Sequence, residues 1–375
     1  MHRSLIQHLY LHIPFCHRVC PYCSFYKHTP GNTDMAAFVD AILNELTLHQ
    51  RQLDLRPKTI YFGGGTPTAL SRSHLTTLIH GLRQRLDLSD LQELCLEANP
   101  KTVSPAKATL LRDLGVTRVS LGVQAWDQPT LTLLGRDHAP DEATETFHIL
   151  RDAGIPALNL DLMFSIPHQT LDIWTAGLHH SLSLKPDHLS CYNLTYEEDT
   201  DFLQRHQTGE LDQNQDRDAD HFGTTIDLLE AAGYEHYETS NFALPGRRSL
   251  HNQAYWQGAD YLGLGPSASS THQRTRWKNI SDTTRYNELL SQNRVPIVES
   301  EDLTDNQWLM ERIALELRTA EGLSLSRIAP SIAHWLPTLQ TENLIHLTPT
   351  HLHLTREGKP LVDQIAETLI PEEPK

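Results

Sequence analysis

Residues 12–23 read His-Ile-Pro-Phe-Cys-His-Arg-Val-Cys-Pro-Tyr-Cys and place three cysteines, Cys16, Cys20 and Cys23, close together. The chain of 375 residues holds only five cysteines, so this clustering needs a specific cause. Three thiolates on one short loop suit a cubane iron–sulfur cluster that keeps one iron free of protein. A tetrahedral zinc site is the alternative, and it needs a fourth ligand that His12 or His17 could supply.

Composition and charge restrict the class of protein. The chain is 39% hydrophobic and 21% charged, as in ordinary soluble proteins. Its formal net charge of −16 makes an extended contact surface for nucleic acid unexpected. There is no secretion signal and no apolar run approaching the ~20 residues of a membrane span, so we expect a cytoplasmic protein without a membrane segment. The cytoplasm is reducing, so we expect the clustered cysteines to be metal ligands and not disulfides. The isolated Cys95 and Cys191 are expected to be buried thiols.

Apolar, β-rich segments alternate with helical patterns through the first 200 residues. Expected strands cover residues 5–13, 59–62, 93–98, 118–123, 159–164 and 188–194, and expected helices cover 35–53, 73–86, 104–114, 141–153 and 171–182. Ser104-Pro105 is a typical helix start, and Gly115 and Gly154 are typical helix ends. This alternation predicts an α/β protein with a parallel sheet and right-handed crossovers. Six such units are too few for a closed eight-fold barrel.

Polar residues stand where the predicted strands end. Gly63-Gly64-Gly65-Thr66-Pro67 follows the second strand, where glycines let backbone amides approach a ligand closely. Further polar positions near strand ends are Glu97, Asn99, Gln124, Arg136 and Asp161. Each alone could be a structural hydrogen-bonding residue. Their occurrence at successive strand ends, where barrels build their sites, favours a binding site.

The cysteine spacing, the preceding His-Ile-Pro-Phe and the following aromatic residue resemble the radical S-adenosylmethionine (SAM) superfamily. The resemblance implies a partial (β/α)6 TIM-like barrel and a [4Fe–4S] cluster on Cys16, Cys20 and Cys23, with SAM at the open iron. SAM carries a ribose diol and a carboxylate, which suit an acidic residue and an arginine respectively. By resemblance, the SAM-contacting positions are Tyr10, Gly64, Gly65, Thr66, Glu97, Gln124, Arg136 and Asp161.

Within the superfamily the chain resembles the oxygen-independent coproporphyrinogen oxidases and the HemW-type haem chaperones. The oxidases continue the motif to a fourth cysteine, where this chain has Phe25, and they carry an N-terminal extension that is not expected here. Residues 251–256, His-Asn-Gln-Ala-Tyr-Trp, resemble the haem-binding motif of the chaperones, with His251 as the iron ligand. Arg247 and Arg248 could meet the propionates. The alternative is that His251 is a structural histidine among core aromatics.

The resemblance divides the chain into three parts. Residues 1–235 are the expected core barrel, 236–295 a connecting segment with the HNxxYW motif, and 296–375 a small C-terminal α+β domain, winged-helix-like and similar to that of the oxidases. Predicted elements of this last part are residues 305–318, 344–347, 352–355 and 360–369. Two positions depart from the family pattern: Ser165 replaces a glycine, and Ser269 stands where relatives often have histidine.

The sequence therefore predicts a haem chaperone that binds haem as cargo and transfers it to an apo-haemoprotein. No nucleic acid partner is expected, and a membrane-associated partner stays open. The alternative is an enzyme, an oxygen-independent coproporphyrinogen III oxidase, which removes carboxyl groups from a porphyrinogen. A radical enzyme acting on RNA is a third and weaker reading because of the acidic balance.

Overall fold

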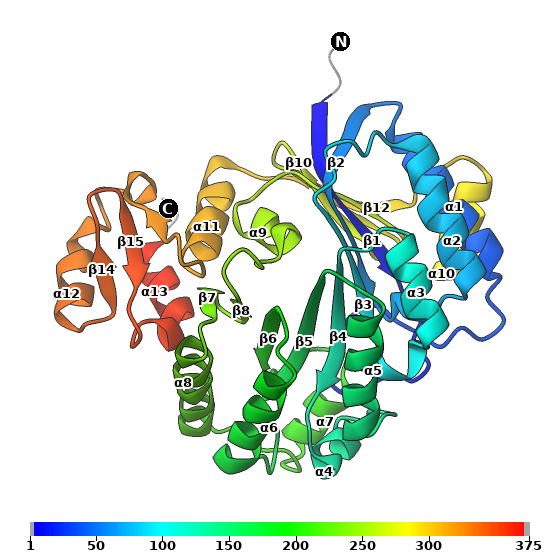
Figure 1. Cartoon of the computed structure of the whole chain (residues 1–375). Helices are drawn as coiled ribbons and strands as arrows, with labels where there is room; N and C mark the ends of the chain where they lie inside the picture. The colour runs from blue at the N-terminus through cyan, green and yellow to red at the C-terminus, as the bar shows by residue number, and fades with distance from the viewer. Residues whose placement is uncertain (1–3, 371–375) are drawn as a thin grey trace.

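A nine-stranded sheet forms the centre of the larger part of the molecule in the computed structural model, which describes residues 4–370 (Figure 1). The strand order is β7-β8-β6-β5-β4-β3-β2-β1-β9. Strands β1 to β6 run parallel, and β9 pairs parallel to β1. The strands of this sheet are β1 (Ser4–Ile13), β2 (Leu53–Gly64), β3 (Glu93–Ala98), β4 (Arg118–Gln124), β5 (Ala157–Phe164), β6 (His188–Asn193), β7 (Glu235–Glu238), β8 (Asn241–Ala243) and β9 (Leu262–Leu264).

Helices connect the six parallel strands and cover the outer face of the sheet, as the sequence predicts (Figure 1). These helices are α1 (Met35–His49), α2 (Arg72–Arg85), α3 (Pro105–Asp113), α4 (Gln128–Leu133), α5 (Pro140–Asp152) and α6 (Leu171–Ser183). Together with β1–β6 they form the partial barrel. Helix α1 ends earlier than the predicted residue 53, because β2 already begins at Leu53.

Local sequence signals account for the helix ends. The Ser104 side chain accepts a hydrogen bond from the backbone of Lys107 at the start of α3, with Pro105 in the first turn. Gly115 and Gly154 follow α3 and α5 with φ of +71° and +87°. Only glycine adopts this left-handed conformation without strain, so both positions end their helices as predicted.

The two faces of the sheet differ in character. In β1 and β2, Leu9, Leu11, Ile60 and Phe62 are fully buried in the apolar cluster that also contains Phe38 of α1. The residues that alternate with them point to the inner face and are polar or aromatic: His8 pairs with Thr59, Tyr10 with Tyr61 and His12 with Gly63. The inner face is therefore the one that can carry a site.

The sheet continues past residue 235, where the sequence analysis placed the end of the core barrel. β8 pairs antiparallel to β6 and β7 pairs antiparallel to β8. Helices α7 (Asp201–Gln207) and α8 (Gln215–Ala231) precede β7, and α9 (Leu250–Trp256), which carries the HNxxYW motif, lies between β8 and β9 in the chain. A small antiparallel sheet follows, formed by β10 (Ser269–His272), β11 (Thr275–Asn279) and β12 (Ile297–Asp302), with α10 (Thr283–Ser291) inserted.

The C-terminal part has an apolar cluster of its own. It consists of α11 (Asp305–Glu316), β13 (Leu323–Ser324), α12 (Leu336–Thr341), β14 (Ile345–Leu347), β15 (His351–Leu354) and α13 (Val362–Leu369), with the strands in the order β13-β15-β14. This small α+β domain lies beside α8 and β7 (Figure 1). It contacts the larger part through a backbone bridge between Glu238 and Thr319 and an ion pair between Arg356 and Asp227.

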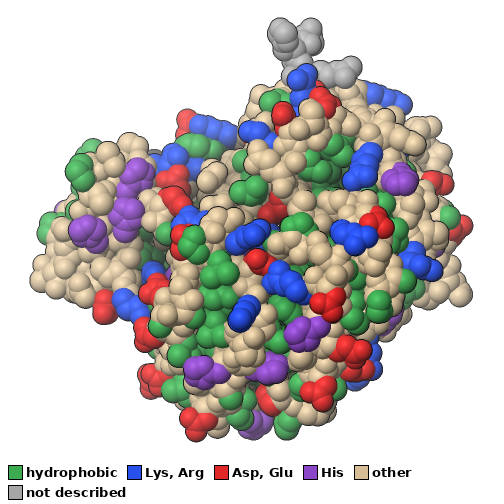
Figure 2. Space-filling view, viewed as in Figure 1, with side chains coloured by type: hydrophobic (Ala, Val, Ile, Leu, Met, Phe, Trp, Pro, Cys, Tyr) green, Lys and Arg blue, Asp and Glu red, His purple; other side chains and the backbone are tan. Residues whose placement is uncertain are grey.

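The face of the molecule in Figure 2 carries Lys and Arg side chains interspersed with Asp and Glu, and histidines gather over the small domain. Within residues 4–370, no helix combines the length and apolar character needed to span a bilayer.

Candidate functional site

The three clustered cysteines lie on the loop between β1 and α1. The loop is closed at its base, because the backbone N–H of Cys16 donates to the carbonyl of His28 (3.0 Å) and the N–H of His28 donates to the carbonyl of Pro14 (2.9 Å). All three cysteine side chains are free thiols and partly exposed, whereas Cys95 and Cys191 are buried as predicted. The loop therefore presents three thiols and no disulfide.

A cavity of about 440 Å³, here called the main cavity, opens at the carboxyl ends of the parallel strands. All three clustered cysteines line it. The predicted SAM-contacting residues that also line it are Gly64, Gly65, Thr66, Glu97, Gln124, Arg136 and Asp161. Tyr10 does not line the cavity; it lies one layer deeper, beside Tyr61, with ring centroids 6.2 Å apart. The structure thus brings these residues together from four strands, β2 to β5, and from the loops that follow β1, β2 and α4.

The glycine run at the end of β2 is required by close packing. A Cβ at Gly64 would come within 2.5 Å of the His12 ring, and a Cβ at Gly65 within 2.7 Å of the backbone of Pro14. The N–H of Gly65 donates to the carbonyl of Ile13 (2.9 Å). Gly64 also has a φ of +103°, which side chains rarely adopt. The run therefore lets the start of the cysteine loop rest directly on the end of β2.

Arg136 contacts one of the clustered thiols directly. Its Nη1 donates to the Sγ of Cys20 (3.6 Å) and its Nη2 donates to the carbonyl of Gly122 (2.7 Å). Its Nε is buried and has no partner within the described residues. A buried guanidinium with a free donor suits a ligand carboxylate at this point of the cavity.

Two carboxyl groups lie at the inner wall of the main cavity. Glu97 accepts a hydrogen bond from the Tyr61 hydroxyl (2.8 Å), and Asp161 accepts from Ser120 Oγ (2.7 Å) and Asn159 Nδ2 (2.8 Å). Burial, with the nearby charge of Asp161 adding to it, raises the pKa of Glu97 to about 7. Burial also raises the pKa of Asp161, against the hydrogen bonds that favour its charged form. Such a wall offers acceptors for hydroxyl groups of a ligand.

The geometry of the loop favours an iron–sulfur cluster over a zinc site completed by His12. Burial raises the pKa of Cys16 and Cys23, so metal binding has to displace protons there. Both ring nitrogens of His12 are already engaged, Nδ1 with the Tyr10 hydroxyl (3.1 Å) and Nε2 with the carbonyl of Tyr26 (2.8 Å). Among residues 4–370, no three Cys, His, Asp or Glu side chains have the spacing of ligands around a single metal ion. In a cubane cluster the three thiolates bind three different irons. The lack of single-ion spacing therefore counts against zinc and does not count against a cluster.

Tyr61 was not predicted from the sequence, yet it lines the main cavity and bonds to Glu97. Lys27, Tyr192 and Phe25 were likewise given no part in a ligand site, and they line the cavity too. Phe25, which stands at the position of the oxidases' fourth cysteine, is 65% exposed. The alternation of side chains along β2 indicates the inner face for Tyr61, because Thr59, Tyr61 and Gly63 share one side.

His251 lies on α9, away from the lining of the main cavity, and is 1% exposed. Its Nδ1 contacts the Thr59 hydroxyl (2.7 Å) and its Nε2 contacts the Tyr255 hydroxyl (2.9 Å). Burial lowers the pKa of His251 to about 3, which keeps the imidazole neutral. A neutral imidazole is the form that ligates iron. Iron can reach it only if one of these two hydrogen bonds is exchanged.

The two arginines assigned to the haem propionates already form ion pairs with acidic side chains of this chain. Arg247 pairs with Asp187 (3.5 Å), and Arg248 pairs with Glu235 (2.9 Å) and Glu321 (2.7 Å). The second departure from the family pattern, Ser269, is exposed at the start of β10 and does not line the main cavity.

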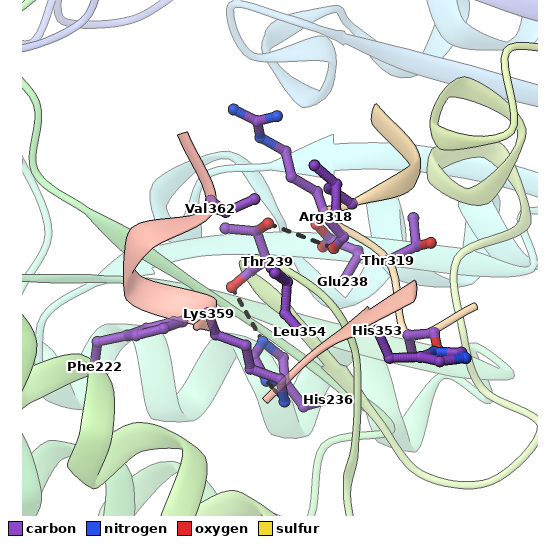
Figure 3. A pocket seen from close by; sticks show the side chains of 12 residues that line it. Phe222, His236, Glu238, Thr239, Arg318, Thr319, His353, Leu354, Lys359 and Val362 are labelled. Carbon is purple, nitrogen blue, oxygen red and sulfur yellow. Dashed lines mark hydrogen bonds between the residues drawn. The ribbon is translucent and has the colours of Figure 1, made fainter. Parts of the chain in front are cut away.

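A second cavity of about 200 Å³, the seam cavity, lies between the barrel and the small domain (Figure 3). Its lining includes His236, Glu238, Arg318, His353 and Lys359. Glu238 is 2% exposed, its Oε1 has no partner within the described residues, and burial raises its pKa to about 7. The two parts of the chain therefore meet across a polar seam.

Comparison with known proteins identifies the family. The radical SAM superfamily pattern matches residues 10–176. The chain is 34% identical to the "Heme chaperone HemW" of Bacillus subtilis, over 95% of this chain and 97% of the relative. It is 40% identical to the HemW of Escherichia coli over 69% of this chain and 68% of that protein. The chain belongs to the HemW family of radical SAM proteins.

This HemW family member shares its fold with a relative of known structure. The coproporphyrinogen III oxidase (HemN) of Escherichia coli, described as a radical SAM enzyme, superimposes with a TM-score of 0.84, over 98% of this chain and 90% of that one. At 23% sequence identity this likeness shows the fold alone. Membership of the radical SAM superfamily implies a [4Fe–4S] cluster and SAM as cofactors, and the donors around the main cavity fit both.

Proposed function

We propose that this protein is a haem chaperone: it binds haem as cargo and passes it to an apo-haemoprotein, with a cluster and SAM held in the main cavity. The observation that carries the proposal is identity of 30% or more, along nearly the whole chain, to proteins named as HemW haem chaperones. The HNxxYW motif on α9 agrees with it, because an imidazole and neighbouring aromatic faces suit a haem.

In the main cavity, Cys16, Cys20 and Cys23 would hold a [4Fe–4S] cluster. When bound, the cluster supplies an electron to the SAM sulfonium. Arg136 offers its free Nε to the ligand carboxylate, while Glu97 and Asp161 offer acceptors to hydroxyl groups. All three are held by their own hydrogen bonds, which fixes their orientation before a ligand arrives.

For haem, His251 would be the iron ligand. Its Nε2 bonds to the Tyr255 hydroxyl, so the tyrosine side chain has to turn away before the nitrogen can bind iron. Trp256 ends the same helix and supplies an aromatic face. We call the arrangement of α9 closed when His251 is bonded to Thr59 and Tyr255, as in this structure. The closed arrangement would then be the haem-free state of the protein.

A haem titration tests the proposal. Wild type, His251→Ala and His346→Ala are compared by absorbance, the last because His346 is exposed on β14 in the small domain. Aromatic surfaces also hold porphyrins without ligation, so binding alone does not identify the iron ligand and the spectra are compared. We expect the Soret band to shift or weaken only in His251→Ala. Equal spectra and equal affinity in all three proteins would refute His251 as the ligand.

The enzyme alternative is tested by product analysis. We expect no turnover of coproporphyrinogen III by the reconstituted protein under reducing conditions with SAM, because Phe25 replaces the fourth cysteine of the oxidases. Protoporphyrinogen accumulating beyond one equivalent per protein would replace the chaperone proposal with the oxidase.

A further inference from the structure

Tyr61 belongs to two sites at once. Its hydroxyl donates to Glu97 Oε1 (2.8 Å) at the wall of the main cavity. Its ring stacks on the imidazole of His251, with centroids 5.1 Å apart and an interplanar angle of 22°. A single rigid side chain on β2 therefore contacts both the proposed SAM pocket and the proposed haem ligand.

Helix α9 rests on the inner face of β2 through His251. The imidazole is stacked on Tyr61 and bonded to the Thr59 hydroxyl, two residues before Tyr61 on the same strand face. Any movement that frees His251 has to break this stack. The position of Tyr61 thus sets how firmly α9 is held.

A second path of hydrogen bonds runs from the main cavity to the same helix. Asp161 accepts from Asn159 (2.8 Å), Asn159 Oδ1 contacts His188 Nδ1 (2.7 Å), and His188 Nε2 contacts the Tyr237 hydroxyl (2.7 Å). The Tyr237 hydroxyl accepts from the backbone N–H of Ser249, the N-cap of α9 (3.3 Å). Both carboxyl groups of the cavity wall are therefore joined to α9 by continuous contacts.

We propose that Tyr61 couples the two sites, so that SAM bound beside Glu97 holds α9 closed and weakens haem binding through His251. The inference rests on the proposed function and concerns its regulation. Ligand hydroxyl groups that donate to Glu97 favour its carboxylate form, and a hydrogen bond to a carboxylate is roughly twice as strong as one to a neutral group. The stronger bond keeps the Tyr61 ring on His251. Because binding is reciprocal, haem weakens SAM binding by the same factor.

Hydrogen exchange of α9 amides tests the coupling without haem. The anaerobically reconstituted protein is compared with and without saturating SAM, in wild type, Tyr61→Phe and Tyr234→Phe. Tyr61→Phe keeps the ring and removes only the hydroxyl. Tyr234→Phe is the matched control, because its buried hydroxyl bonds to the carbonyl of Pro186, and neither residue lines the main cavity. We expect SAM to slow α9 exchange in wild type and in Tyr234→Phe, and to slow it clearly less in Tyr61→Phe, where only the path through Asp161 remains.

Haem titrations of the same proteins measure the coupling as the ratio of the haem dissociation constant with saturating SAM to that without SAM. We expect saturating SAM to raise the haem dissociation constant about fivefold to tenfold in wild type and Tyr234→Phe, and by a clearly smaller factor in Tyr61→Phe. A ratio of one in wild type, or an undiminished ratio in Tyr61→Phe, overturns the coupling. If His251→Ala leaves haem binding unchanged, the proposed haem site fails, and the exchange measurement still decides whether Tyr61 links the cavity to α9.

Discussion

Arg136 lies beside the cluster loop, and its buried Nε has no partner among residues 4–370, which gives a specific expectation for SAM binding. Removing a charge-assisted hydrogen bond costs ~1.5–3 kcal/mol, so Arg136→Ala should weaken SAM binding by about ten- to a hundredfold. Equilibrium binding to the reconstituted protein measures this, and the cluster absorbance should persist. Arg83→Ala, whose guanidinium bonds to the carbonyl of Leu114 outside the cavity, is the control. Unchanged SAM affinity in Arg136→Ala would make this arginine structural only.

Cys20 is expected to be essential for the cluster. Two thiolates are too few to anchor a cubane, so Cys20→Ala should lose the brown absorbance after anaerobic reconstitution. Cys95→Ala removes a thiol that is buried in β3 and should keep the full absorbance. Retention of the chromophore by Cys20→Ala would contradict the ligand assignment.

Ser165 is a strained departure from the family's glycine. Its φ is +60°, in the left-handed region, and its buried hydroxyl has no partner within the described residues. This conformation costs a residue with a side chain roughly 1–2 kcal/mol, which glycine avoids. Glycine also makes the unfolded chain more flexible, which lowers stability by about 0.4–1 kcal/mol. We expect Ser165→Gly to raise the free energy of unfolding by about 0.5–1 kcal/mol in urea titrations.

Ser89→Gly provides the contrast, because Ser89 is exposed and its φ is not positive. There the substitution frees the unfolded chain and removes the hydrogen bond of the Ser89 hydroxyl to Asp87, so it should lower the free energy of unfolding. If both variants lose stability equally, the strain at Ser165 is not real.

Among the elements, α9 is held at its start by a buried ion pair. Glu93 accepts from the backbone N–H groups of Leu250 and His251, and it pairs with Arg118 at 3.0 Å. Glu93→Ala would leave the buried guanidinium unpaired, and we expect it to lower the free energy of unfolding by about 3 kcal/mol. Amide exchange in α9 should accelerate at the same time.

Glu288→Ala is the matched control for this ion pair. Glu288 makes an exposed pair with Arg285 on α10, and such pairs contribute no more than ~1 kcal/mol. If Glu93→Ala costs no more than Glu288→Ala, the buried pair is not what fixes the start of α9.

At the level of the whole molecule, Glu238 makes the seam between barrel and small domain sensitive to pH. Burial raises the pKa of Glu238 to about 7 in the folded state, against about 4.3 in an unfolded chain. Between these values the folded state binds the extra proton, so the contribution of Glu238 to stability falls as pH rises from about 4.5 to 7 and is then constant. The contribution is on the order of 3 kcal/mol.

Glu238→Gln should remove this part of the pH dependence. In urea unfolding, the free energy of unfolding near pH 8 relative to that near pH 5 should be higher for the variant than for wild type. Part of the slope should persist, because burial also raises the pKa of Glu97 to about 7. Glu367→Gln, at an exposed position on α13, should leave the slope unchanged. An equal slope in Glu238→Gln and wild type would contradict the assignment.

Local patterns in the sequence were sufficient for the cluster loop and for the main elements of the barrel. Cys16, Cys20 and Cys23 lie in one loop, so their spacing alone indicates a shared centre. The six parallel strands and their helices follow from apolar periodicity and from capping residues such as Ser104. The short strands β8 and β9 were missed, because three residues carry no readable periodicity.

Contacts between distant segments were decided by the tertiary structure. His251 meets Thr59 across 192 positions of the chain, and Tyr61 stands between His251 and Glu97 only because α9 packs on the inner face of β2. The HNxxYW motif alone suggests an available imidazole, whereas the fold buries it with both nitrogens engaged. A motif specifies side-chain chemistry, but the order of strands and the packing of helices determine which groups meet and which are already occupied.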